Sequence, residues 1–400
     1  MTDHISKNQS LLLLRGARVV LPQGIEQDVA LLVEGNRIAR VLRGADASPT
    51  HAGATLDLVG LTIFPGFIDV HNHGAAGIDT MEASADDLHH VSTFLASCGV
   101  TAWLPTLVPG ADEDYSRAAQ AVTGLMNEQD ERPAAARALG IHYEGPFVNV
   151  AQCGALRTPY FRTYSNSSDL DTLTKIAHEG AAHMITLAPE IDGGIELVRE
   201  LAARGWVVSI GHTRADVETL DRAAAAGARH MTHFMNAMLP LNHRAPGPVG
   251  WGLVRDDVTC DVIADGVHSD PLILKLILRC KTAERIALIS DSIAPTGLGD
   301  GEYHIWDEKI AVVNGRTQNE RGSIAGSVVT MLDCVRMMLS LGASAHDVAR
   351  MAASTPARLL GVDDSCGSIE EGKRADLVAL DDEGRVRLTM VGGRMAFRVE

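Results

Sequence analysis

Residues 64–74 read Phe-Pro-Gly-Phe-Ile-Asp-Val-His-Asn-His-Gly, and this segment organises the sequence on either side of it. Its apolar centre lies between Pro65-Gly66 and Gly74, which is typical of a short buried strand. Residues i and i+2 of a strand point to the same face, so His71 and His73 are expected to present two imidazoles side by side. This geometry chelates metals, although an isolated His-x-His arises about as often by coincidence in a chain with 16 histidines.

Strand-like and helix-like segments alternate from this point onward. Eight apolar segments have the length and composition of strands: Phe67–Val70, Ala102–Leu104, Leu139–Tyr143, Met184–Leu187, Val207–Ile210, His230–Thr232, Thr259–Ile263 and Ile286–Ser290. The helix-like segments include Ala85–Cys98, Ser116–Asn127, Gly194–Arg204, Arg214–Ala226 and Pro271–Cys280. Eight such units in roughly 300 residues predict an α/β fold, a (β/α)8 barrel of the TIM type. The alternative is an open doubly wound sheet, but no Gly-x-Gly-x-x-Gly follows the first strand.

Short strand-like segments separated by glycine-containing turns flank this region at both ends of the chain. They occupy Leu11–Ile63 and recur after Gly372. We predict that both ends build one small β-sandwich domain, from residues 11–63 and 362–400, beside a catalytic barrel at 64–361. Residues 1–10 are polar and charged without the apolar centre of a secretory signal, and are predicted to form a disordered tail.

The overall composition excludes several classes of function. The 400 residues include 51 acidic and 35 basic side chains, and the formal net charge of −16 argues against a nucleic-acid partner. The longest apolar runs, such as Leu272–Leu278, are too short for a bilayer span, so no membrane partner is expected. The six cysteines show no Cys-x-x-Cys spacing, which fits buried thiols in the reducing cytoplasm.

Ligand-type side chains directly follow five of the eight predicted strands. In chain order, after the first, third, fifth, sixth and eighth strands, they are His71 and His73, Glu144, His212, His233 and Asp291. Alone, each would be an ordinary rim residue, or a helix cap in the case of Asp291. Enzymatic barrels gather their chemistry at the carboxyl ends of the strands, so the six together predict a metal centre.

The ligand types indicate a catalytic metal centre rather than a structural one. Histidine and carboxylate ligands with an open position suit one or two divalent ions, Zn²⁺ first and Fe²⁺ or Mn²⁺ as alternatives, whereas structural zinc sites usually contain cysteine. Glu144 is the natural bridge between two ions. A bound metal lowers the pKa of a water molecule to about 7, and Asp291 is expected to carry the proton to a leaving group.

Ordered motifs over nearly the whole chain resemble the N-acetylglucosamine-6-phosphate deacetylases of the amidohydrolase superfamily. These motifs are Pro65–Gly74, Asp79–Met81, Leu104–Thr106, His142–Phe147, Thr186–Glu190, Gly211–Thr213, Thr232–Met238, Ala264–His268, Ser290-Asp291 and Ala325–Ser327. The resemblance implies a metal-dependent hydrolase with the barrel and small β domain inferred above, present as a homodimer. It implies hydrolysis of the acetamide of N-acetyl-D-glucosamine 6-phosphate to D-glucosamine 6-phosphate and acetate.

The resemblance also assigns roles to residues of this chain. It implies that Glu144, His212 and His233 hold one metal, that His71 and His73 belong to a second, and that Asp291 is a metal ligand and the general acid/base. For the amino sugar phosphate it implies a set of binding positions: Ala155, Asn236, Ala237, Arg244, His268, Ile324 and Ala325. Of these, Arg244 and His268 would face the phosphate, with Arg244 reaching across the dimer.

One position departs from the family pattern. Leu156 stands where the family has a histidine that polarises the acetyl carbonyl, and leucine donates no hydrogen bond. Three explanations stay open: a second metal polarises the carbonyl, Arg157 supplies the donor, or the substrate differs. The alternative substrates are N-acetylgalactosamine 6-phosphate and a non-phosphorylated amide. A non-catalytic metal-binding scaffold is a further alternative, which the complete ligand set disfavours.

Overall fold

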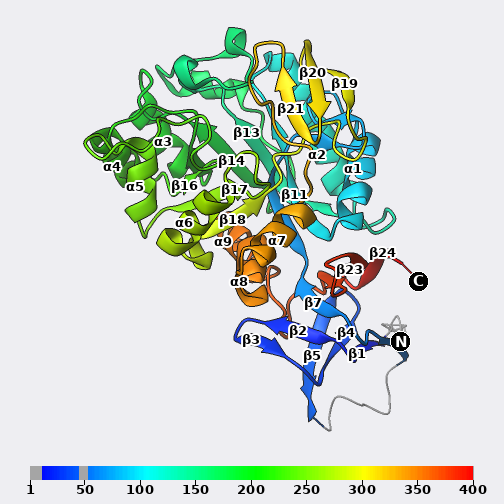
Figure 1. Cartoon of the computed structure of the whole chain (residues 1–400). Helices are drawn as coiled ribbons and strands as arrows, with labels where there is room; N and C mark the ends of the chain where they lie inside the picture. Colours follow the sequence, from blue (N-terminus) through cyan, green and yellow to red (C-terminus); the bar gives the residue numbers. More distant parts are fainter. Residues whose placement is uncertain (1–10, 45–52, 400) are drawn as a thin grey trace.

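The computed structural model of the chain describes residues 11–44 and 53–399, so the tail predicted at 1–10 lies outside the described residues. Eight parallel strands form a barrel, one for each predicted strand: β8 (Phe67–Asn72), β11 (Val100–Leu107), β13 (Gly140–Glu144), β14 (Ala182–Leu187), β15 (Val207–Ile210), β16 (His230–Met231), β17 (Thr259–Ile263) and β18 (Ile286–Ile289). Each strand pairs with the next, and β8 pairs with β11. The predicted TIM-type barrel is confirmed (Figure 1).

Backbone hydrogen bonds close the barrel between its last and first strands. The N–H of Asp291 donates to the carbonyl oxygen of His71 at 3.0 Å, and the N–H of His73 donates to that of Ser292 at 2.8 Å. The same contacts bring the ends of β8 and β18 together, so residues 220 positions apart lie side by side.

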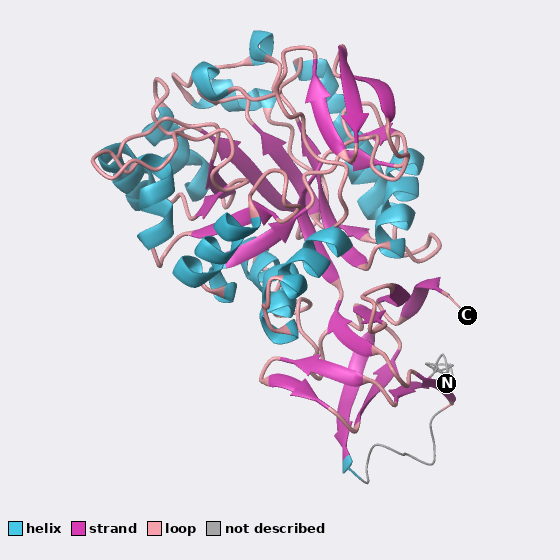
Figure 2. Cartoon of the chain, in the orientation of Figure 1, coloured by secondary structure: helices cyan, strands magenta, loops and turns pink. Residues whose placement is uncertain are grey.

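Helices surround the barrel strands (Figure 2). Their bounds are α1 (Ala85–Ser97), α2 (Asp112–Glu128), α3 (Gly194–Ala203), α4 (Val217–Ala226), α5 (Gly247–Val254), α6 (Pro271–Lys281), α7 (Met331–Ser340), α8 (Ala345–Ala349) and α9 (Thr355–Leu360). Side-chain caps begin several of them, as where Ser84 and Asp87 form a capping box at α1. None of the helices in the described part of the chain has the length and apolarity needed to cross a bilayer.

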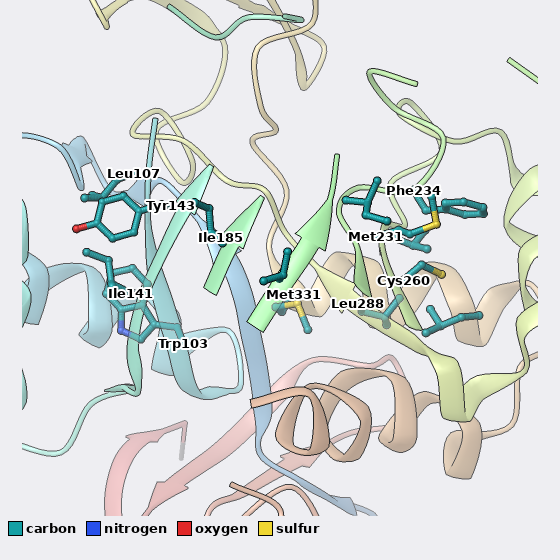
Figure 3. Packing of buried hydrophobic residues seen from close by; sticks show 14 of the residues in the cluster. Trp103, Leu107, Ile141, Tyr143, Ile185, Met231, Phe234, Cys260, Leu288 and Met331 are labelled. Carbon is teal, nitrogen blue, oxygen red and sulfur yellow. The ribbon is translucent and has the colours of Figure 1, made fainter. Parts of the chain in front are cut away.

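Side chains on the outer face of the barrel strands form the main apolar core with the helices. Trp103, Tyr143 and Leu288 belong to this cluster, and Figure 3 shows Trp103 and Tyr143 on one side of the view with Ile185, and Leu288 on the other with Met231. The alternate positions face inward and build a second cluster with residues of α9. The inward residues include Ala102, Leu104, Met184, Val207, Ile263 and Ile289. This strand alternation fills the barrel and leaves the carboxyl ends of its strands for polar side chains.

Two sheets form a small β domain from both ends of the chain. Their strands are β1 (Leu11–Arg15), β2 (Arg18–Leu21), β3 (Gly24–Glu26), β4 (Val29–Glu34), β5 (Arg37–Arg43), β6 (Ala54–Asp57), β7 (Thr62–Pro65), β22 (Leu377–Leu380), β23 (Val386–Val391) and β24 (Arg394–Arg398). One sheet has the order β5-β4-β1-β6 and the other β24-β23-β22-β7-β2-β3, so C- and N-terminal strands meet in the second sheet, where β22 pairs with β7. The sheets share one apolar core, as predicted. The domain boundaries at 63/64 and 361/362 remain our proposal.

A three-stranded antiparallel sheet follows β18, which the sequence pattern did not predict. It consists of β19 (Gly301–Ile305), β20 (Glu308–Val313) and β21 (Arg316–Asn319). In Figure 1 it lies at the end of the barrel away from the small β domain. The remaining short strands are β9 (Gly74–Ala75), β10 (Ile78–Asp79) and β12 (Arg137–Ala138).

Candidate active site

The six predicted ligand-type residues converge at the carboxyl ends of the barrel strands. Each is buried, with no more than 7% of its surface exposed. Two groups of three offer ligand atoms within 4.8 Å of one another: His71, His73 and Glu144, and Glu144, His212 and His233. Glu144 belongs to both groups.

The Glu144 carboxylate lies between two pairs of imidazoles. Its Oε1 is 2.9 Å from the Nε2 atoms of both His212 and His233, and its Oε2 is 3.3 Å from Nε2 of His73. The Nε2 atoms within each pair are also close, at 3.0 Å for His71 and His73 and 3.1 Å for His212 and His233. Four imidazole nitrogens directed at one carboxylate make a donor set that suits divalent metal ions.

Asp291 completes the cluster from the end of β18. Its Oδ1 lies 3.4 Å from Nε2 of His71 and 3.3 Å from Nε2 of His73. The carboxylate therefore stands on the side of the cluster formed by the His71/His73 pair.

Three of these residues have a strained backbone. His212, His233 and Asp291 have φ angles of 46°, 30° and 49°, in the left-handed region that non-glycine residues rarely adopt. Each lies two residues beyond the end of β15, β16 or β18. Such strain costs about 1–3 kcal/mol per residue and is typical of functional sites, because the surrounding structure must hold it.

Hydrogen bonds from neighbouring groups orient several of the histidines. Nδ1 of His73 lies 3.2 Å from the carbonyl oxygen of Thr106, and Nδ1 of His212 lies 2.7 Å from that of Gln152, which leaves their Nε2 atoms for the cluster. The Asp261 carboxylate accepts the backbone N–H of His233. Sequence patterns do not identify Gln152 or Asp261 as supports, because their roles depend on contacts across 60 and 28 positions, respectively.

His142 lies beside the cluster rather than in it. Its Nε2 is 2.8 Å from Oγ1 of Thr186, its Nδ1 is 3.1 Å from the carbonyl oxygen of Val70, and its ring packs against that of His71. Burial and the neighbouring His71 hold the pKa of His142 well below its ordinary value. A neutral imidazole is therefore expected here.

The buried charges of the cluster stabilise one another. Burial alone would lower the pKa of His73, but the Asp291 and Glu144 carboxylates raise it to about 10. At His233 burial again lowers the pKa, but the Glu144 carboxylate raises it to about 9. Although burial favours protonation of Glu144 and Asp291, the surrounding histidines lower the pKa of both carboxyls. Both carboxylates are thus ionised at neutral pH.

A cavity of about 480 Å³ opens onto the cluster. Five of the seven predicted substrate-binding residues line it: Ala155, Asn236, Ala237, His268 and Ile324. The other two are elsewhere. Ala325 is fully buried in the apolar core beneath β19–β21, and Arg244 is exposed on a loop outside the cavity of its own chain.

The cavity lining includes Leu156 and also Trp306, a residue that the sequence did not point to. Leu156 lines the cavity, but Arg157 donates from Nε to the carbonyl oxygen of Pro109 at 2.9 Å and does not line it. Trp306 at the β19–β20 turn lines the cavity instead, and its ring centroid lies 5.5 Å from that of His73. The only signal in the sequence is a tryptophan between two short alternating segments, which does not reveal that the turn reaches the first strand.

With this geometry in view, comparison with known proteins gives a consistent result. The model of the amidohydrolase family matches residues 62–396. The N-acetylglucosamine-6-phosphate deacetylase of Bacillus subtilis (strain 168) is 37% identical over 338 residues, covering 84% of each chain. The chain belongs to the N-acetylglucosamine-6-phosphate deacetylase family of amidohydrolases.

Two further relatives extend this result. The N-acetylgalactosamine-6-phosphate deacetylase of Escherichia coli O157:H7 is 33% identical and covers 96% of this chain and 98% of its own. The crystal structure of N-acetylglucosamine-6-phosphate deacetylase from Pasteurella multocida superposes with a TM-score of 0.88 at 28% identity, covering 96% of this chain and 99% of that one. The protein is therefore a hydrolase of this family, and its buried histidine and glutamate groups are able to hold a metal.

Proposed function

We propose that the protein hydrolyses the acetamide of N-acetyl-D-glucosamine 6-phosphate to D-glucosamine 6-phosphate and acetate. The observation that carries this proposal is the Glu144 carboxylate between two histidine pairs, with Asp291 beside it at the floor of a cavity. The relatives named for this reaction match most of the chain and support the assignment.

The residues fit one or two divalent cations, and we propose Zn²⁺, with Fe²⁺ and Mn²⁺ as alternatives. Glu144, His212 and His233 would hold one ion, and His71, His73 and Asp291 would hold a second bridged by Glu144. When bound, the metal supplies a water of lowered pKa and polarises the acyl oxygen. A second ion near His73 would supply the polarisation for which Leu156 has no donor.

The remaining chemistry falls to Asp291. Its lowered pKa leaves the carboxylate ionised, so it can accept a proton from the attacking water. Water oxygen bonds to the acyl carbon, the carbon–nitrogen bond breaks, and Asp291 returns the proton to the departing amine. Acetate and the free amino sugar leave as products. Positioned general acid–base groups of this kind contribute about 10²–10⁴-fold to rate.

We propose that the sugar phosphate binds along the polar lining after β16 and β17. The Asn236 side chain lines this part of the cavity, and its buried Nδ2 makes no hydrogen bond to any described residue. His268, paired through Nδ1 with Asp265 at 2.7 Å, would contact the phosphate. Arg244 would contact the phosphate only from the partner in a homodimer, because its own chain leaves it exposed.

We also propose a cytoplasmic location.

A second candidate is the galactosamine epimer, which the Escherichia coli relative favours at 33% identity. A single experiment separates the possibilities. Release of acetate and free amine is measured with the two 6-phosphates and the unphosphorylated sugar, with and without a chelator. Turnover confined to the phosphorylated glucosamine derivative, lost with chelator and restored by Zn²⁺, supports the proposal; turnover of none of them refutes it.

A further inference from the structure

The turn between β19 and β20 holds two non-glycine residues in a conformation that favours glycine. Trp306 and Asp307 have φ angles of 55° and 61°. Paired positive φ angles in a two-residue hairpin turn usually select Asn-Gly or Gly-Gly. A tryptophan at the first position therefore gains nothing from the turn itself, which points to a role for its side chain.

The hairpin delivers this side chain to the cluster of ligand-type residues. The Trp306 ring meets the His73 ring edge-on, at an angle of 78° between the planes. Arg321 donates to the carbonyl oxygen of Ala155 at 3.0 Å, which connects the β19–β21 sheet to the loop after β13. The guanidinium of Arg157 also lies 4.0 Å from the Asp307 carboxylate. Ala155 and Arg157 flank Leu156 in the chain, and Asp307 follows Trp306. These two contacts therefore hold the segment of Leu156 close to the segment of Trp306.

The indole presents carbon rather than nitrogen to the cavity. Trp306 is half-buried, but its Nε1 atom is buried and makes no hydrogen bond of good geometry within the described residues. The part of the ring that lines the cavity is consequently apolar.

The cavity is divided between an apolar and a polar sector. Trp306 follows β18 in the chain and packs against His73, which follows β8. Leu156 follows β13. These strands lie in one part of the barrel, in the order β18-β8-β11-β13. The polar lining residues Asn236 and His268 follow β16 and β17. Asp291 stands at the His71/His73 pair, next to the apolar sector. An acyl carbon attacked there would direct its alkyl end toward Trp306 and Leu156.

We propose that Trp306 and Leu156 form the apolar wall of an acyl compartment, and that Trp306 sets the longest N-acyl chain that the enzyme hydrolyses. This inference rests on the proposed deacylase function. Trp306 is a specificity-determining residue in this role and transfers no proton. Filling or opening a hydrophobic pocket by one methylene changes selectivity by about 10–200-fold.

The test compares kcat/KM for the N-acetyl, N-propionyl and N-butyryl derivatives of glucosamine 6-phosphate. The main variant is Trp306→Gly, because glycine favours the observed φ and the turn should still form. Asn314→Gly is the matched control: it relaxes a positive φ of 51° at an exposed residue in the β20–β21 turn of the same sheet and keeps the indole. Trp306→Phe retains part of the wall and guards against loss of folding in the glycine variant, as monitored by Tm.

We expect the butyryl-to-acetyl ratio of kcat/KM to rise at least about tenfold in Trp306→Gly, to rise less in Trp306→Phe and to stay at the wild-type value in Asn314→Gly. An active wild type whose ratio is unchanged in both Trp306 variants would overturn the acyl wall alone. A wild type that hydrolyses none of the three derivatives would overturn the deacylase function as well, so the two failures are distinguishable.

Discussion

At the scale of single residues, the two carboxylates of the site, Glu144 and Asp291, differ in the histidines they contact. Glu144 contacts both histidine pairs through its two oxygens, whereas Asp291 contacts only the His71/His73 pair. Under the proposed mechanism, Glu144 balances the charge of the whole cluster and Asp291 exchanges a proton with the attacking water. Loss of either should therefore have different consequences.

Replacing Asp291 by Asn should lower kcat by about 10²–10⁴-fold, because the amide cannot accept the proton of the attacking water. Metal held by Glu144, His212 and His233 should remain. Steady-state kinetics and metal analysis on the same sample check this. Undiminished hydrolysis would refute the assigned role of Asp291.

Replacing Glu144 by Gln should strip metal from both histidine pairs, because the neutral amide removes the charge shared by the two groups. The matched control is Glu190→Gln, on the loop after the neighbouring strand β14. Glu190 accepts hydrogen bonds from Asn149 and Thr213 and lies outside both groups. Metal content by elemental analysis is the readout, and a Glu144→Gln protein with full metal content would contradict the bridging role.

At the scale of elements, the closure between β8 and β18 supports the site. The buried Asp69 carboxylate accepts the Ser290 hydroxyl at 2.6 Å and the Asn72 amide at 3.1 Å. Burial raises the pKa of Asp69, which these hydrogen bonds counter. The two strands that carry His71 and Asp291 are thus connected by side chains as well as by backbone.

Replacing Asp69 by Ala should lower the free energy of unfolding by about 3 kcal/mol, because buried donors on Ser290 and Asn72 lose their acceptor. Asp216→Ala removes an exposed cap at the start of α4 and should cost only about 1 kcal/mol. Urea unfolding of the two variants provides the comparison. Equal losses would show that the closure contributes no more than an ordinary helix cap.

At the scale of the whole molecule, the metal-free protein stores opposite charges at its centre. The raised pKa values of His73 and His233, about 10 and about 9, mean that both carry protons at neutral pH when no metal is bound. The two protonated imidazoles contribute fully to the free energy of unfolding below the ordinary histidine pKa of about 6.5. This contribution is lost as the pH rises through the folded-state pKa values of 9–10. Metal binding must displace these protons.

We therefore expect chelator-treated protein to lose stability between about pH 6.5 and 10 and metal affinity to increase over the same range. Tm with and without chelator, and calorimetric titration with Zn²⁺ in buffers of different ionisation enthalpy, measure both effects. Proton uptake on metal binding at pH 7, or an affinity independent of pH, would contradict the charge arrangement.

The sequence by itself determined the strand order, the barrel, the small β domain from both termini and the identities of the ligand-type residues. Strands and helices follow from local hydrophobic periodicity, and position after a strand predicts the rim of the barrel without coordinates. The Phe64–Gly74 segment carried the first of these signals.

Only the tertiary structure decided how these residues meet. The position of Glu144 between the histidine pairs depends on barrel closure, and the strained φ angles of His212, His233 and Asp291 depend on packing. Arg244 and Ala325 lie outside the cavity, and Trp306 reaches it from a hairpin more than 230 residues after His73. Contacts between distant segments leave no periodic pattern in the sequence, because they arise from the geometry of the closed barrel.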